Sequence, residues 1–225
     1  MSNPFIALKN VTKTYYQGET PVLALDQLDL NVTRGEFLAI TGKSGCGKST
    51  LINIIGGLDS PDRGQVIVKG EDITRMDDRR LTLFRRDKIG IIFQFFNLLP
   101  ILTIQENISL PYHLKEGSNT IEASVDHLLR QMGLFDRRNH RPHELSGGEM
   151  QRVAICRALI NDPEIILADE PTGNLDSTTG SQVLEILRRL KEEQGKTILL
   201  VTHSQEGAAI ADRILRMQDG RLLPF

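Results

Sequence analysis

The chain has 225 residues, which is enough for one large domain or two small ones and enough to bury a hydrophobic core without disulfides or metals. Its 27 Lys and Arg residues against 29 Asp and Glu residues give a net charge of -2 with no basic block, so we expect no nucleic-acid partner. No apolar stretch approaches the roughly 18 residues of a membrane-spanning helix, and the two cysteines lie far apart, as in a protein of the reducing cytoplasm.

Short apolar runs rich in β-branched residues recur along the chain and predict strands. Several are apolar throughout, as strands buried on both faces are, and an amphipathic helical pattern fills 177–194 between two of them. The predicted strands lie at 5–11, 37–41, 65–70, 89–93, 164–168, 197–201 and 213–217. This alternation predicts an α/β fold with a mostly parallel central sheet.

From about residue 97 to residue 162 the strand-like runs are replaced by helical patterns, such as those at 103–110 and 147–160. No internal repeat or low-complexity tract interrupts the chain. We therefore expect residues 1–225 to form a single domain, whose α/β core carries an inserted helical subdomain at about 97–162.

A glycine-rich segment, TGKSGCGKST at residues 41–50, follows the strand at 37–41 and precedes an apolar helical pattern. It fits G-x-x-x-x-G-K-[ST], in which glycines let consecutive backbone N–H groups turn toward phosphate oxygens at a helix N-terminus. We expect Lys48 to reach the β- and γ-phosphates of a nucleotide and Ser49 to coordinate Mg²⁺. The alternative, a surface turn that fits by chance, is disfavoured by the preceding strand. The expected nucleotide-contacting residues of this segment are Gly42, Ser44, Gly45, Cys46, Gly47, Lys48, Ser49 and Thr50.

A second potential anion-binding helix N-terminus occurs in LSGGEMQR, where Ser146, Gly147 and Gly148 precede a helical pattern. By itself the segment is best interpreted as a serine N-cap with a glycine turn. A nucleotide has a single γ-phosphate, which the first loop already contacts from one side. The chain also contains the glycine loop and, as described next, two adjacent acids at 169–170. In that context the phosphate-binding interpretation is favoured over a simple N-cap.

The strand at 164–168 is followed by two adjacent acids, Asp169 and Glu170. Asp169 is placed to hold Mg²⁺ directly or through a water molecule, and Glu170 is free to polarise an attacking water. Two adjacent acids in an arbitrary loop would carry no such meaning. Behind four apolar residues, in a chain with a phosphate loop, they indicate nucleotide hydrolysis.

Four motifs together carry a family resemblance: GKSGCGKST, LSGGEMQR, IILADE, and LLVTHS with its His203. Their order and spacing resemble the ATPase subunit of ATP-binding-cassette transporters, and the resemblance covers essentially the whole chain. It implies ATP and Mg²⁺ as ligands and a P-loop NTPase core with a mostly parallel sheet, an N-terminal antiparallel β portion and the helical insertion. It also implies a homodimer in which each ATP lies between the glycine loop of one copy and the LSGG of the other.

The resemblance also implies roles for four further residues. Gln94 would face Mg²⁺ and the membrane partner, His203 would meet the γ-phosphate, and Asp176 would lie in the loop at the dimer interface. Tyr15 would stack on adenine, with Tyr16 as the less favoured alternative. Taken alone each has an ordinary structural explanation, since a lone histidine or glutamine beside a strand is common.

The stretches ILADEPTGNLD and FNLLPILTIQENISLP are most similar to a branch with lipoprotein-releasing, macrolide-exporting and peptide-sensing bacterial ATPases. That branch works with a membrane permease, so we expect a cytoplasmic protein, peripheral on the inner face of the cell membrane. The segment 95–111 is expected to meet the permease, with Phe95, Phe96 and Leu98 as exposed apolar side chains.

Two other classes of protein use the same phosphate loop. A soluble ABC-type ATPase that acts on DNA or ribosomes would carry a long coiled coil or a second cassette, and the chain has neither. A small-molecule kinase would leave LSGGEMQR and Glu170 unexplained. The favoured interpretation is an ATP-hydrolysing subunit that powers a permease.

Overall fold

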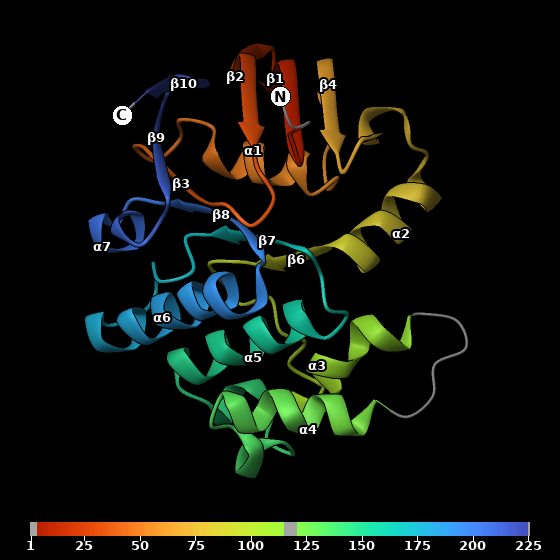
Figure 1. Ribbon diagram of the computed structural model, residues 1–225, viewed down its shortest axis with the longest axis vertical. Coiled ribbons are helices and arrows are strands. Elements are labelled where there is room, and N and C mark those ends of the chain that lie inside the picture. Colours follow the sequence, from red (N-terminus) through yellow and green to blue (C-terminus); the bar gives the residue numbers. More distant parts are fainter. Residues whose placement is uncertain (1–3, 115–120, 225) are drawn as a thin grey trace.

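The computed structural model describes residues 4–114 and 121–224, which form two sheets with helices on both sides of the larger one (Figure 1). The strands are β1 (Ile6–Gln17), β2 (Thr20–Val32), β3 (Phe37–Thr41), β4 (Arg63–Val68), β5 (Glu71–Asp72), β6 (Ile89–Ile92), β7 (Ile165–Asp169), β8 (Thr197–Thr202), β9 (Arg213–Gln218) and β10 (Arg221–Pro224). The helices are α1 (Lys48–Ile55), α2 (Asp78–Lys88), α3 (Ile104–His113), α4 (Glu122–Gln131), α5 (Gly147–Leu159), α6 (Ser177–Gln194) and α7 (Gln205–Ala209).

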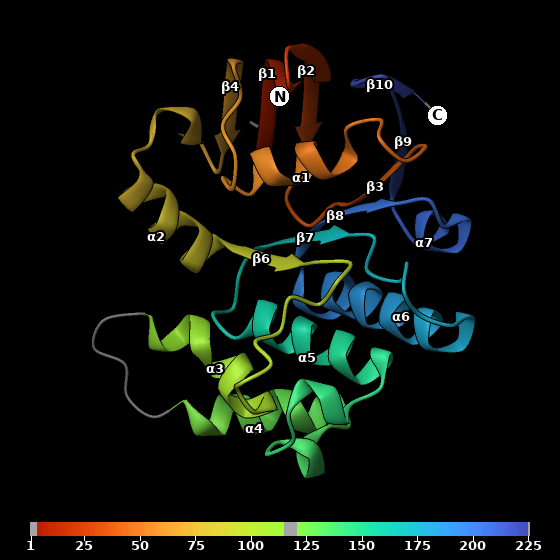
Figure 2. The same ribbon diagram turned by 180° about the vertical axis from the view of Figure 1, so that it is seen from behind.

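The larger sheet has the strand order β10-β9-β3-β8-β7-β6 and is parallel except for β10. Helix α1 covers one face of this sheet, and α5 and α6 cover the other (Figure 2). The apolar residues of β3, β7 and β8 are consequently buried on both faces. This explains why these strands are apolar throughout instead of alternating. The expected α/β fold with a mostly parallel sheet is confirmed.

The smaller sheet is antiparallel, with the order β2-β1-β4-β5. Its buried side packs on α1, where Ile6 and Val66 share one hydrophobic cluster with Leu51 of the helix. The expected N-terminal antiparallel portion is therefore confirmed. Strand β2 is not among the predicted strands. Its apolar run at 22–25 is short and mostly exposed, and charged or polar residues alternate with the apolar ones after it; the buried residues of β2 are Leu25, Leu28, Leu30 and Val32.

Helices α3, α4 and α5 share a separate hydrophobic cluster that includes Ile108, Val125 and Val153. They lie between β6 and β7, within the expected helical region, although its bounds as a subdomain stay a prediction. The sequence patterns do not predict α2, a charged helix that buries a single residue, Phe84. Among the helices of the described ranges, none combines the length and apolar character that crossing a membrane requires.

The apolar segment after Gln94 differs in part from the expectation. Phe95 is 73% exposed and Ile101 is 77% exposed, but Phe96 is half-buried. Leu98 packs against the cluster of α3, α4 and α5. Phe96 and Leu98 were both expected to be exposed, and both are partly buried; for Leu98 the reason is its packing against that cluster.

The parallel strands bring the predicted motifs to one edge of the sheet. In the order β3-β8-β7, Thr41 pairs with Thr202, and Asp169 pairs with Val201. The glycine loop follows β3, His203 follows β8, and Glu170 follows β7. All three therefore leave from the carboxyl ends of adjacent strands, which is where ligands bind in open α/β sheets.

Candidate functional site

Helix α1 begins at Lys48 without a side-chain cap and without an acid in its first turn. By contrast, α3, α5 and α6 each begin with a side chain that accepts a backbone hydrogen bond. The first N–H groups of a helix have no partner within the helix and carry partial positive charge. The start of α1 therefore fits an anion as the missing partner.

Two glycines of the loop are required by close approach of the backbone. Gly47 has φ 107, and a Cβ atom there would lie 2.2 Å from the carbonyl oxygen of Ala24. A Cβ atom at Gly42 would lie 2.4 Å from the carbonyl oxygen of Met217. Strands β2 and β9 thus pack directly on the loop and fix its path, which any larger residue would displace.

The Lys48 side chain is 7% exposed, and its ammonium lies inside the curve of the loop. It donates hydrogen bonds to the carbonyl oxygens of Gly42 at 2.8 Å and Lys43 at 3.2 Å. Its Nζ also lies 3.7 Å from Oε1 of Glu170. The ammonium of Lys48 can exchange some of these acceptors for the phosphate oxygens of a nucleotide, as the motif predicts.

Ser49 and Asp169 meet across the space between α1 and β7. The Ser49 hydroxyl donates a hydrogen bond to Oδ1 of Asp169 at 3.1 Å. Burial, and then the negative charge of neighbouring Glu170, raise the pKa of Asp169 above its ordinary value. The described residues contain no group of three or more His, Cys, Asp or Glu side chains that could hold a metal. This hydroxyl and carboxylate fit Mg²⁺, which keeps waters and takes nucleotide oxygens as further ligands.

Glu170 and His203 form a hydrogen-bonded pair. Oε2 of Glu170 lies 2.8 Å from Nδ1 of His203 and accepts the backbone N–H of His203 at 3.1 Å. Glu170 has φ 47, a left-handed conformation that a non-glycine residue adopts at some cost and that often marks functional sites. Its side chain is 12% exposed, whereas that of His203 is 67% exposed. The carboxylate is thus oriented by the histidine at the sheet edge.

Gln94 lies next to the loop that follows Glu170. Its backbone carbonyl accepts a hydrogen bond from Nδ2 of Asn174 at 3.0 Å, and its Nε2 lies 3.0 Å from where a Cβ of Gly173 would be. The sequence motifs did not single out Asn174 as a functional residue. Its position within GNLD is the signal that could have identified it.

The two candidate aromatic residues lie on different sides of β1. Tyr15 lines the same pocket as the glycine loop, and Tyr16 lines a separate groove with Thr12 and Thr14. This placement favours Tyr15 as the residue that contacts a nucleotide base.

The LSGG residues have structural contacts within their own chain. Ser146 caps α5 by accepting the backbone N–H of Glu149 at 3.3 Å, and Oε2 of Glu149 accepts the backbone N–H of Ser146 at 2.8 Å. A Cβ atom at Gly148 would lie 2.2 Å from Cγ2 of Thr179, so this glycine lets α5 pack against α6. Asp176 caps α6 by accepting the N–H of Thr179 at 3.0 Å.

One pocket of about 480 Å³ unites most of the predicted residues from β1, the glycine loop, α1 and the ends of β6, β7 and β8. It is lined by Tyr15, Val22, Ala24, Ser44, Gly45, Gly47, Lys48, Ser49, Thr50, Gln94, Glu170 and His203. Of the other predicted residues, Gly42, Cys46, Asp169, Ser146, Gly147, Gly148 and Asp176 are not among its lining residues. Val22 and Ala24 were missed because β2 was not predicted.

Comparison with known proteins agrees with this site. Residues 25–173 match the family described as ABC transporter. An uncharacterized ABC transporter ATP-binding protein of Mycobacterium tuberculosis is 49% identical over 98% of this chain and 90% of its own length. The structure of the ATP-binding cassette MJ0796, a protein of Methanocaldococcus jannaschii, superposes with a TM-score of 0.91 at 47% identity and covers 96% of each chain; it is described as a dimer bound to ADP and Pi.

Relatives that also carry a permease match over part of their length. The macrolide export ATP-binding/permease protein MacB of Hyphomonas neptunium is 44% identical over 99% of this chain, which spans 35% of that relative. The fold, the glycine loop, the acidic pair and these similarities lead to one assignment. The chain belongs to the ABC transporter family, as an ATP-binding subunit with ATPase activity.

Proposed function

We propose that the pocket binds ATP together with Mg²⁺ and that hydrolysis of the γ-phosphate takes place at its inner wall. The observation that carries this proposal is that one pocket joins the uncapped start of α1, the buried Lys48 and the Glu170–His203 pair. An anion-binding helix end, a buried cation and an oriented carboxylate are the parts that phosphoryl transfer to water requires.

Each residue has a distinct part in this proposal. Ser49 and Asp169 would hold Mg²⁺, with Gln94 at the adjoining wall. When bound, the ion neutralises charge that develops on the phosphate oxygens. Lys48 binds and orients the β- and γ-phosphates through its ammonium.

Glu170 accepts a proton from the attacking water. Its carboxylate is held by the backbone N–H and the ring of His203, so its orientation does not depend on the ligand. The exposed His203 ring leaves Nε2 free to meet the γ-phosphate, because Nδ1 is engaged by Glu170.

A second copy of the chain would complete each site. Ser146, Gly147 and Gly148 are not among the lining residues of their own chain's pocket. They lie at the start of α5, where the Ser146 side chain caps the N–H of Glu149 and leaves other N–H groups of the first turn for an anion. In the proposed dimer these residues contact the γ-phosphate held by the other copy, with Asp176 at the interface. The MJ0796 structure, described as a dimer bound to ADP and Pi, supports the dimer in this proposal.

The proposed membrane partner meets a surface near α2 and α5 that combines apolar side chains with arginines. A second pocket of about 450 Å³ is lined by residues of α2, β6 and α5, among them Arg85, Arg86 and Arg157, together with Phe93, Asn97, Pro111, Leu114 and Asn161. Phe95, Leu99 and Ile101 are exposed apolar side chains of the following segment. We define the docking surface as this pocket and these three side chains, and propose that it binds a permease of the export or lipoprotein-release branch on the inner face of the membrane.

Trapping of the dimer tests this proposal. Glu170→Gln keeps the size of the side chain but removes its charge, so ATP should bind without being hydrolysed. Because ATP binds the closed state preferentially, the variant should elute as a dimer with Mg·ATP and as a monomer without nucleotide. Size-exclusion chromatography with light scattering measures both states.

Gly147→Asp in the Glu170→Gln background is the matched control. A Cβ atom at Gly147 meets its nearest neighbour at 3.5 Å, an ordinary contact, and an acid in the first turn is favourable for a helix. The added carboxylate would nevertheless repel the γ-phosphate of the partner's ATP. This double variant should bind ATP and stay monomeric. A dimer that persists in it would contradict the proposed sandwich.

A further inference from the structure

Asp59 connects the phosphate-loop helix to the aromatic residue at the rim of the pocket. The hydroxyl of Tyr15 donates a hydrogen bond to Oδ2 of Asp59 at 2.7 Å. The ammonium of Lys13 donates to Oδ1 of the same carboxylate at 2.7 Å, as does the backbone N–H of Ser60. Neither the sequence motifs nor the family assignment singles out Asp59, yet it holds two side chains of β1.

The backbone at Asp59 is itself attached to α1. The N–H of Leu58 donates to the carbonyl oxygen of Asn53 at 2.8 Å, and the N–H of Asp59 donates to the same oxygen at 3.3 Å. Asn53 belongs to α1, whose first residue is Lys48. A rigid helix thus carries the phosphate-binding ammonium at its start and the anchor of Tyr15 just beyond its end.

Lys13 strengthens the same arrangement. Its ammonium lies 5.2 Å from the centroid of the Tyr15 ring, so it contacts both the ring and the carboxylate that holds the ring. Burial raises the pKa of Asp59, but hydrogen bonds from Lys13 and Tyr15 outweigh it and leave that pKa below its ordinary value. Burial and the hydrogen bond to Asp59 raise the pKa of Tyr15. Near neutral pH the acceptor is therefore charged and the donor keeps its proton.

We propose that Asp59 is a positioning residue for nucleotide binding: it fixes the ring of Tyr15 at the distance from the phosphate loop that an adenine base requires. This inference rests on the proposed function, since it needs a base to stack on Tyr15. Tyr15 is 40% exposed, and its side chain also has a hydrogen bond with Thr50, so loss of the Asp59 anchor would loosen the ring toward solvent without removing every contact. A fixed ring loses less conformational freedom when the base binds.

Asp62 provides a matched control in the same segment. Its Oδ2 accepts the backbone N–H of Thr14 at 2.6 Å, and its Oδ1 lies 4.0 Å from Nζ of Lys13. It is a carboxylate with the same charge and the same neighbouring strand, but it makes no hydrogen bond with the Tyr15 hydroxyl. Asp62→Ala therefore controls for loss of charge and for loosening of β1.

The experiment compares the binding of ATP and of inorganic tripolyphosphate, both with Mg²⁺, by isothermal titration calorimetry. Tripolyphosphate meets the phosphate loop but has no base. Asp59→Ala and Tyr15→Phe should each weaken ATP binding by about 3- to 20-fold, part of the roughly 5- to 150-fold that a base–aromatic stack contributes. The double variant should be no weaker than either single one. Tripolyphosphate affinity should not change, and Asp62→Ala should bind ATP as the wild type does.

Tyr15→Ala separates this inference from the proposed function. If it weakens ATP binding while Asp59→Ala does not, the stacking role stands and the positioning role of Asp59 is overturned. If Asp59→Ala weakens ATP and tripolyphosphate equally, Asp59 supports the loop itself, which also overturns the inference. A wild type that binds tripolyphosphate as tightly as ATP would overturn base stacking and with it the role of Asp59.

Discussion

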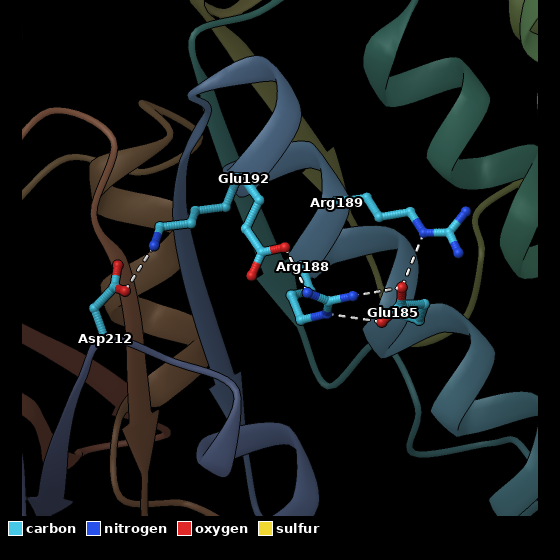
Figure 3. A network of polar contacts seen from close by, with 6 residues as sticks. Glu185, Arg188, Arg189, Glu192 and Asp212 are labelled. Carbon is cyan, nitrogen blue, oxygen red and sulfur yellow. Dashed lines mark hydrogen bonds and ion pairs between the residues drawn. The ribbon is translucent and has the colours of Figure 1, made fainter.

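The nucleotide pocket and the outer surface of α6 both contain contacts between a basic and an acidic side chain. Those in the pocket are buried, whereas those on α6 are exposed to water. In the pocket, Lys48 and Glu170 lie 3.7 Å apart, with side chains 7% and 12% exposed. On α6, Glu185 accepts hydrogen bonds from Arg188 and Arg189, and these three side chains are 38%, 40% and 62% exposed (Figure 3). The residue types alone therefore do not say what an ion pair does.

The difference between the two regions follows from water. On α6, water and salt screen charges that the helix already places at i,i+3 and i,i+4 spacing, so the pairs contribute little. In the pocket, burial makes each charge costly unless it is compensated. A bound nucleotide would supply the partners that compensate these buried charges. Substitutions in the pocket and on α6 should therefore differ in their effects on turnover, on affinity for ATP and on stability.

The largest difference is expected in turnover. Glu170→Gln removes the carboxylate that accepts a proton from water, so kcat should fall by roughly 10²- to 10⁴-fold. The same substitution at Glu185 should leave kcat unchanged, because that side chain does not line the nucleotide pocket. Steady-state phosphate release measures both variants. A Glu170→Gln variant with kcat within about twofold of the wild type would remove Glu170 from the mechanism.

The next difference is expected in affinity. Lys48→Ala removes a charge-assisted hydrogen-bond donor to phosphate, a loss of about 1.5–3 kcal/mol, so ATP should bind roughly 10- to 100-fold more weakly. Arg188→Ala removes a cation of the exposed network and should not change the affinity for ATP. Calorimetric titration with Mg·ATP compares the two. Equal affinities in both variants would show that the ammonium of Lys48 does not meet the phosphates.

The smallest difference concerns stability, and its sign is opposite in the two regions. Burial, then the charge of Glu170, raise the pKa of Asp169, so ionised Asp169 costs stability that is regained as pH falls. Hydrogen bonds from Arg188 and then Arg189 lower the pKa of Glu185 to about 2. Ionised Glu185 therefore stabilises the fold above its unfolded-state pKa of about 4.3, and this stability is lost as the pH falls toward 2.

Thermal melts without nucleotide test this sign. At pH 7, Asp169→Asn should raise Tm by about 1–4 °C, whereas Glu185→Gln should lower it by less than about 2 °C. The Asp169→Asn effect should shrink as pH falls, and the Glu185→Gln effect should vanish in high salt. A Tm lowered by Asp169→Asn would show that the ionised carboxylate stabilises the empty site.

Much of the site could be predicted from sequence because its parts are contiguous segments next to buried strands. The strands that carry the glycine loop, the acidic pair and His203 are apolar throughout, which is a strong local signal. The half-exposed β2 lacked that signal, so the pocket residues it supplies were missed. Leu98 was predicted to be exposed because the residues that partly cover it belong to α3, α4 and α5, and its own segment gives no sign of those contacts.

The sequence by itself determined which segments could bind phosphate, because a glycine loop, a following lysine and a helix start impose their geometry within a few residues. Tertiary structure alone decided which distant groups support them. Ala24 packs on Gly47, Asn174 holds the carbonyl of Gln94, and Asp59 holds Tyr15. Each of these contacts joins residues far apart along the chain, so it exists only once the strands have paired and the helices have packed upon them.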